Sequence, residues 1–327
     1  MTGATAPYGV ATVRGLLLRP EVEHILAVGA EPGPGRLARV LDERVEYMQA
    51  DLTHAREVRT LLYGPVRERG IDTIVHGAHH RPPVHRRLER LIDVETTRTI
   101  LHIVERHPTI RRLVFRSHAD VYRVDAELPT LIAEDHPLEL RGRLPQRVRD
   151  HVEADVMVCT RMGLAPVSIA VLRFAEIFGP DCGSQLWDYL GARVCFRALG
   201  FDPMLNLLSS EDAGTATVLA AASDAQGVFN VPGADTLPLT AAIDRSHRLC
   251  LSLPGPVLAP VYGLRRAASP AEFVFALNRD IFHFSAVLDG ERARRVLGYA
   301  PNVHVTWPPP RRAASDGPPH LRHTSSV

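Results

Sequence analysis

The chain has 327 residues, of which 45% are apolar and 23% charged, and its formal net charge is +1. This length supports one large domain or two interleaved domains, and the near-neutral charge argues against nucleic acid or an anionic membrane surface as a partner. The sequence shows neither a signal peptide nor an apolar run near twenty residues, so we expect a cytoplasmic protein without a membrane span.

Two further features of the composition restrict the chemistry. The four cysteines, Cys159, Cys182, Cys195 and Cys250, form no C-x-x-C pair, which indicates reduced thiols. The chain contains no lysine, and all 38 of its basic residues are arginine. Because a guanidinium stays protonated at any working pH, lysine-dependent chemistry is not available anywhere in the chain.

The first sixteen residues have the pattern of a phosphate-binding loop that runs into a helix. Gly3 and Gly9 are the outer glycines of such a loop, and Ala6 replaces the middle one. Glycines let the backbone approach a pyrophosphate, and the N–H groups at the helix N-terminus then face the anion. Only Met1 precedes Thr2, so the central strand expected before the loop is nearly absent. We favour a start that belongs further upstream over a gap in the sheet centre.

Strands and helices then alternate along the chain. The apolar patterns predict strands over 22–28, 45–50, 72–78 and 111–117, and helices over 10–18, 54–69 and 84–107. This alternation predicts a doubly wound parallel sheet. In NAD-binding units, an acidic residue holds the ribose at the end of the strand that follows the first helix. Here that strand covers 22–28, its end is at Gly29, and Glu31 follows two residues later.

The motifs keep the order and spacing of the extended short-chain dehydrogenase/reductases, and the chain resembles the NAD-dependent epimerase/dehydratases of that family, such as UDP-glucose 4-epimerase. The matching segments are 2–9, 51–52, 76–78, 93–94, 117–122, 134–137, 172–180, 229–231 and 289–301. Residues 264–279 also resemble an actinobacterial and myxobacterial branch whose active site is unusual.

The resemblance implies an α/β fold: a Rossmann-like doubly wound parallel sheet with a small interleaved C-terminal substrate lobe. The expected larger domain covers 1–180, with returns near 203–234 and 280–288. The expected smaller lobe covers 181–202 and 235–307, and residues 308–327 have the composition of a disordered tail. Relatives often dimerise through two long helices, here near 84–107 and 146–162, so we expect a homodimer.

The resemblance also implies NAD or NADP as cofactor and a nucleotide-linked sugar as substrate. The expected cofactor-binding residues are Gly3, Thr5, Ala6, Gly9, Glu31, Asp51, Leu52, Gly77, Ala78, Ser117 and Arg149. The expected substrate-facing residues are His79, His80 and Glu176. We expect no metal, because the cluster of His76, His79, His80 and His85 matches no usual zinc pattern.

The family reaction requires a Tyr-x-x-x-Lys pair and a Ser or Thr, and this chain lacks them. The family carboxylate that follows the lysine matches Glu153, which places Pro145 and Arg149 at the tyrosine and lysine positions. Using Asp155 instead gives Arg147 and His151. The Ser/Thr position falls on His118. The standard mechanism therefore cannot operate here.

The candidate catalytic residues are His118, Ser117 and Arg149. An imidazole titrates near working pH, which suits general acid–base catalysis by His118, although the pattern favours a histidine packed or hydrogen-bonded at a strand end. Three interpretations remain: a divergent NAD(P)-binding epimerase/dehydratase-type protein with altered catalysis, a non-catalytic sensor or partner-binding module, and an oxidoreductase that uses His118.

Overall fold

The computed structural model describes residues 1–79, 86–142, 144–268 and 273–309. Its helices are α1 (Pro7–Leu17), α2 (Ala55–Leu61), α3 (Arg86–Arg90), α4 (Thr97–Val104), α5 (Gln146–Cys159), α6 (Gln185–Leu190), α7 (Ser210–Ala221), α8 (Leu239–Arg245), α9 (Gly255–Ala268), α10 (Phe275–Asn278) and α11 (Glu291–Leu297). Its strands are β1 (Ile25–Gly29), β2 (Val45–Gln49), β3 (Thr73–His76), β4 (Arg112–His118), β5 (Leu131–Ile132), β6 (Ser168–Phe174), β7 (Glu176–Ile177), β8 (Val194–Ala198), β9 (Met204–Leu208), β10 (Gly227–Val231), β11 (Asp235–Pro238), β12 (Leu249–Leu253) and β13 (Val287–Leu288).

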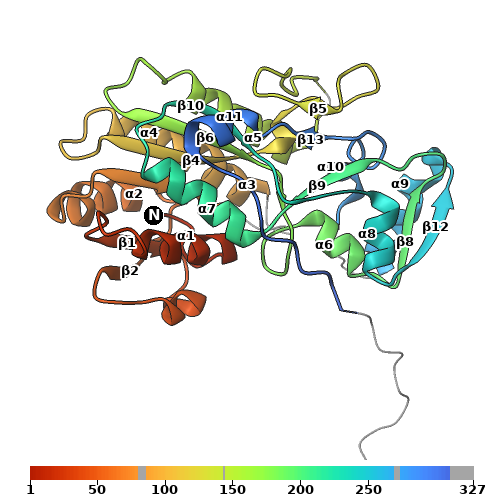
Figure 1. The fold of residues 1–327 in the computed structure, drawn as a ribbon, viewed down its shortest axis with the longest axis horizontal. Coiled ribbons are helices and arrows are strands. Elements are labelled where there is room, and N and C mark those ends of the chain that lie inside the picture. The colour runs from red at the N-terminus through yellow and green to blue at the C-terminus, as the bar shows by residue number, and fades with distance from the viewer. Residues whose placement is uncertain (80–85, 143, 269–272, 310–327) are drawn as a thin grey trace, which may run out of the picture.

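The larger domain is built on a parallel sheet whose centre is formed by the chain start (Figure 1). On one side β2 pairs with β1, and on the other β3, β4, β6 and β10 follow in that order. Thr2 joins the two groups through parallel bridges to Val28 and His76. Two residues therefore hold the place of the central strand, which agrees with the prediction that this strand is nearly absent.

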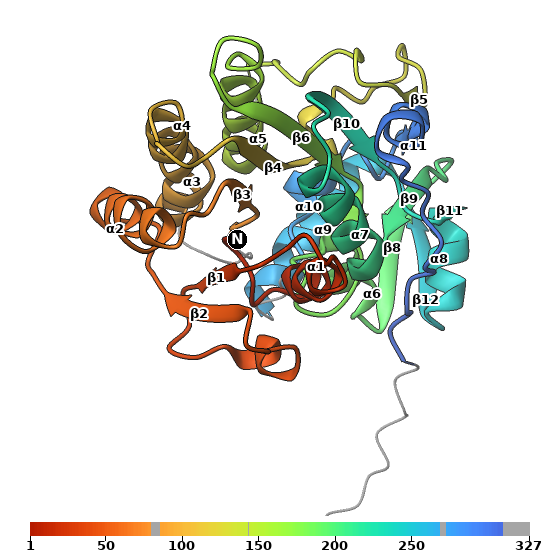
Figure 2. The same cartoon turned by 60° about the vertical axis from the view of Figure 1, so that its left-hand side comes forward.

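Helices cover both faces of this sheet (Figure 2). Alternate side chains of β6 point to opposite faces: Ile169 and Val171 pack with apolar residues of α2 and α4, whereas Ala170 and Leu172 pack with the alanines of α7. This alternation is the two-residue period of a strand buried on both sides. The predicted doubly wound α/β fold is confirmed.

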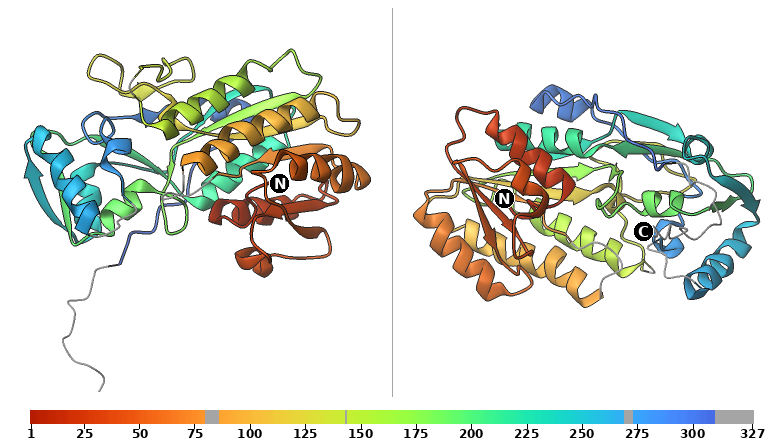
Figure 3. Two further views of the ribbon diagram at one scale, coloured as in Figure 1. Left: turned by 180° about the vertical axis from the view of Figure 1, so that it is seen from behind. Right: turned by 90° about the horizontal axis from the view of Figure 1, so that it is seen from below.

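The smaller lobe lies at the far end of the molecule from the chain start (Figure 3). Its strands form a β11-β9-β7 sheet and a parallel β8–β12 pair. Aromatic rings fill its core, and Tyr262 stacks on Phe275 with ring centroids 5.2 Å apart. This lobe covers the edge of the larger sheet at which β4 and β6 end.

The boundaries between the larger domain and the smaller lobe differ from those predicted from the sequence. Strand β9, expected in a return of the larger domain, pairs with β7 because Leu205 and Leu207 belong to the core of the smaller lobe. Helix α11, expected in the smaller lobe, packs on β10 because Ala293 and Leu297 join the core around Phe229.

The helix predicted over 84–107 is present from Arg86 to Val104, with a π-helical turn at Leu91–Thr96 between α3 and α4. The segment predicted as a tail lies outside the described residues from residue 310 onward. Among the residues that the structure describes, no helix is both long and apolar enough to cross a lipid bilayer.

Candidate functional site

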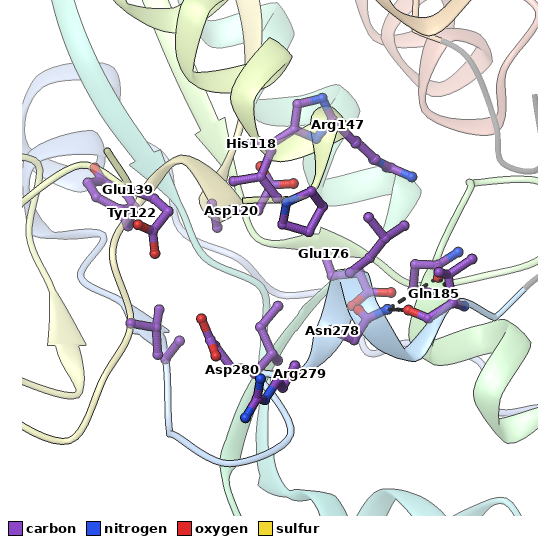
Figure 4. Close-up of a pocket in the computed structure, with 18 of the residues that line it drawn as sticks. His118, Asp120, Tyr122, Glu139, Arg147, Glu176, Gln185, Asn278, Arg279 and Asp280 are labelled. Carbon is purple, nitrogen blue, oxygen red and sulfur yellow. Dashed lines mark hydrogen bonds between the residues drawn. The ribbon is translucent and has the colours of Figure 1, made fainter. Parts of the chain in front are cut away.

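A cavity of about 1520 Å³ opens where β4 and β6 end below the smaller lobe. In parallel α/β sheets, ligands bind at this carboxyl edge. His118 ends β4, Glu176 begins β7, and Arg147 lies in the first turn of α5. Figure 4 shows His118 and Arg147 at one end of the cavity and Arg279 and Asp280 at the other.

The loop before α1 has the conformation that a phosphate loop requires. Gly3 adopts a φ of +71°, and a Cβ at Gly9 would lie 2.2 Å from the carbonyl oxygen of Gly3. Helix α1 begins at Pro7 after Ala6, and no side chain caps its N-terminus. The first backbone N–H groups of the helix are therefore free to face an anion.

Glu31 compensates for the glycine at the end of β1. Its carboxylate Oε2 lies 2.8 Å from the position that a Cβ of Gly29 would take, and it accepts a hydrogen bond from Thr5 Oγ1 at 3.0 Å. The Tyr47 hydroxyl fixes this turn by donating to the Glu31 carbonyl at 2.5 Å. The Glu31 carboxylate therefore lies where the sequence pattern of NAD-binding units places an acidic side chain.

The other predicted cofactor residues lie at the ends of β2 and β3. Asp51 is exposed and accepts from the Thr53 backbone N–H at 2.9 Å, whereas Leu52 is buried. Gly77 is enclosed, because a Cβ there would lie 1.3 Å from the Tyr8 hydroxyl. The Ala78 N–H donates to Thr2 Oγ1 at 3.2 Å.

His118 lies among the rings of His151 and His79 and the carboxylates of Asp120 and Asp93. It stacks on His151 of α5, with ring centroids 4.0 Å apart and planes 6° apart. His151 Nδ1 contacts the Asp120 carboxylate at 2.8 Å, and its Nε2 lies 3.8 Å from Asp93 Oδ2. His79 meets His118 edge-on at 6.0 Å. His80, the neighbouring predicted substrate residue, lies outside the described residues.

Burial and nearby charges affect the predicted role of His118 as a general acid and base. Burial, with the nearby His151 and Arg116, holds the pKa of His118 well below its usual value. The ring therefore favours its neutral form near pH 7, in which it accepts a proton more readily than it donates one. Asp120 keeps a lowered pKa despite burial because of His151, whereas burial raises the pKa of Asp93 to about 6.

Three histidines with lowered pKa values make stability depend on pH. Burial lowers the pKa of His76 to about 4, and those of His79 and His118 also fall. The unfolded chain then binds more protons below the ordinary pKa of histidine, so stability falls as the pH drops through about 6.5. We expect His76 alone to remove about 2 kcal/mol between pH 7.5 and 5. Urea unfolding at both pH values measures this, and His118→Gln should show a smaller loss than the parent chain.

Ser117 does not take the catalytic place predicted for it. Its side chain points away from the cavity, is only 2% exposed, and donates to Asp155 Oδ2 at 2.5 Å. Asp155 also holds Arg173 through a 2.6 Å contact, and both side chains are buried. Successive residues of β4 face opposite sides of the sheet, so His118 faces the cavity and Ser117 faces away from it.

The structure also corrects the register on α5. Arg149 lines the cavity but is exposed, and its guanidinium donates to Gln146 Oε1 at 2.5 Å. Glu153 is partly exposed and pairs with Arg90 and Arg98. The face that turns inward carries Arg147, His151 and Asp155, one helical turn apart.

Glu176 lines the cavity but is already engaged. Its carboxylate accepts from Ser184 Oγ at 2.6 Å and from the Leu186 N–H at 2.8 Å, and burial raises its pKa. It thereby fixes the start of α6 against β7. Glu176, which was predicted to face the substrate, therefore lies in the cavity wall with its carboxylate already hydrogen-bonded to other parts of the chain.

His118, Asp120 and His151 offer donor atoms that lie within 4.8 Å of one another. Because the two imidazole planes are nearly parallel and stacked, one ion cannot lie in the plane of both rings, as metal ligation by histidine requires. His76 is bonded to Thr2 Oγ1 and Thr97 Oγ1.

Comparisons with known proteins give a fold. No protein-family model matches the chain. Uncharacterised proteins of Mycobacterium tuberculosis and Mycobacterium bovis are each 28% identical to it over 311 residues, which are 92% of this chain and 79% of each relative.

Two solved structures have a fold similar to that of this chain. The UDP-glucose 4-epimerase of Thermus thermophilus in complex with NAD matches with a TM-score of 0.66 at 15% identity, covering 93% of this chain and 94% of that one. The dTDP-glucose 4,6-dehydratase of Bacillus anthracis in complex with NAD matches with a TM-score of 0.65 at 16% identity, covering 92% and 90%. The chain has the fold of the NAD-dependent epimerases and dehydratases.

Proposed function

We propose that this chain binds NAD at its phosphate loop and a nucleotide-linked sugar in the cavity, with altered or reduced catalysis. The observation that carries the proposal is the uncapped start of α1 behind a loop with glycine conformations, in a chain with a cavity at the carboxyl edge of the same sheet. When bound, the nicotinamide would supply hydride transfer. Gly3, Gly9 and the start of α1 would hold the pyrophosphate, and Glu31 would accept from the ribose hydroxyls.

The side chains around His118 favour altered chemistry. Arg147 and His151 occupy the inner face of α5, and neither reproduces a tyrosine activated by a lysine. An arginine cannot exchange a proton at working pH, and burial lowers the pKa of His118. A sugar bound here would meet a fixed cation and a neutral imidazole.

The non-catalytic sensor or partner-binding module is the second candidate. The Tyr8 ring fills the space next to Gly77 and lies under Arg116, whose guanidinium carbon is 4.7 Å from the ring centroid. These bulky side chains restrict the space next to the loop, which favours a non-catalytic module over an enzyme. The His118 oxidoreductase is the third candidate, and it requires that His118→Ala abolish turnover while leaving NAD affinity within a few-fold.

We expect the chain to prefer NAD over NADP by at least tenfold. The Glu31 carboxylate would accept hydrogen bonds from a 2′-hydroxyl and repel a 2′-phosphate. Arg36, the nearest basic candidate for a 2′-phosphate in the sequence, is paired with Asp181. Calorimetric titration of both cofactors measures the ratio.

Glu31→Gln should reduce the preference to less than about threefold, mainly by weakening NAD, because a charged hydrogen bond contributes about 1.5–3 kcal/mol. Glu21→Gln is the matched control, since Glu21 is exposed and belongs to the loop before β1. An unchanged preference in Glu31→Gln would remove Glu31 from the cofactor site.

A further inference from the structure

Two permanent cations meet at the inner end of the cavity. Arg116 precedes His118 by two residues, so both lie on the same face of β4, and Arg147 approaches from α5. Arg116 and Arg147 both line the cavity, and both contribute to the lowered pKa of His118. Figure 4 shows Arg147 together with His118 at this end.

Neither guanidinium has an acidic partner within the described parts of the chain. Arg147 makes no hydrogen bond and no ion pair with any of those residues, and its Nη1 is enclosed. Arg116 contacts the His79 ring and the Tyr8 ring, and its enclosed Nε has no acceptor among those residues.

Two of the nearby carboxylates are already engaged. Asp120 is bonded to His151, and Glu176 accepts from Ser184 and from the backbone of Leu186. Asp93 lies behind His151 and is buried. These three carboxylates moderate the positive potential without providing a direct partner for either arginine.

Cations held together in a partly buried place cost free energy unless anions pair with them. A guanidinium is the side chain that best matches the two oxygens of a carboxylate or phosphate. We propose that the inner end of the cavity, formed by Arg116, His118 and Arg147, is a binding subsite for an anionic group. One step of this inference rests on the proposed function. That step assigns the anionic group to the sugar of the nucleotide-linked ligand, which would then be an acidic sugar.

The first test does not depend on any nucleotide. The melting temperature of the full chain is measured in inorganic phosphate and in chloride at equal ionic strength. Phosphate should raise it by a few degrees more in the parent chain than in Arg147→Gln. Because both proteins retain the phosphate loop, the difference reports the inner end alone. Arg106→Gln, which removes an exposed arginine just after α4, should behave like the parent. Equal responses of parent and Arg147→Gln would overturn the proposal.

The second test identifies where the anion comes from. UDP-glucuronate and UDP-glucose share the diphosphate and differ at the sugar carboxylate, so calorimetry with NAD present isolates that group. The parent chain and Arg106→Gln should bind UDP-glucuronate at least tenfold more tightly. Arg147→Gln should reduce this to less than threefold. Equal binding of the two ligands by the parent would overturn the acidic-sugar assignment and leave the proposed function standing. If neither ligand binds while the phosphate difference persists, the anion subsite stands and the nucleotide-sugar proposal fails.

Discussion

Replacing Asp155 with alanine is expected to lower the free energy of unfolding by about 3–5 kcal/mol, the cost of removing one partner from a buried ion pair. Asp155 and Arg173 are 0% and 5% exposed, and Ser117 bonds to the same carboxylate. The variant leaves the Arg173 guanidinium buried without its anion. Urea unfolding measured by circular dichroism gives the difference.

Glu153→Ala is the matched control on the same helix. Glu153 pairs with Arg90 and Arg98, but its side chain is 39% exposed, so the loss should stay within about 1 kcal/mol. The two variants together decide which carboxylate of α5 is structural. A larger loss for Glu153→Ala than for Asp155→Ala would contradict the register described above.

Replacing Gly9 with alanine should weaken NAD binding by at least about a hundredfold, roughly 2.7 kcal/mol. The new Cβ would lie 2.2 Å from the Gly3 carbonyl oxygen and 2.8 Å from that of Ala4. Both atoms belong to the backbone of the loop, so the loop must change shape. Its N–H groups would then no longer converge on the pyrophosphate. Calorimetric titration of NAD measures the loss.

Gly263→Ala tests that this effect is local. Gly263 is exposed on α9, and a Cβ there would meet no atom within 4 Å. This variant should bind NAD as the parent does, with unchanged or slightly higher stability, since alanine favours a helix. If Gly9→Ala bound NAD within threefold of the parent, the loop would not be the pyrophosphate site.

The larger domain could be predicted because its strands are short apolar runs between helices with a clear period. The near-absence of the central strand followed from Met1 and Thr2 alone. The boundaries of the smaller lobe could not be predicted, because β9 is as apolar as a strand of the main sheet. Its pairing with β7 and β11 assigns it to the lobe.

The candidate site was predicted in its location but not in its details. Glu153 and Asp155 are both carboxylates of one helix, and nothing local says which one is buried. The answer depends on Arg173, which arrives from β6. The lowered pKa of His118 depends in the same way on burial and on neighbours such as Arg116, and neither is visible in a sequence pattern.

The central claim is that the chain keeps a working dinucleotide site although the tyrosine and lysine of the family reaction are missing. The most direct test is calorimetric titration of NAD and NADH into the full chain. The account predicts binding with micromolar affinity at one site per chain. Absence of binding by both forms at millimolar concentration would contradict it and would make the non-catalytic partner-binding module the leading interpretation.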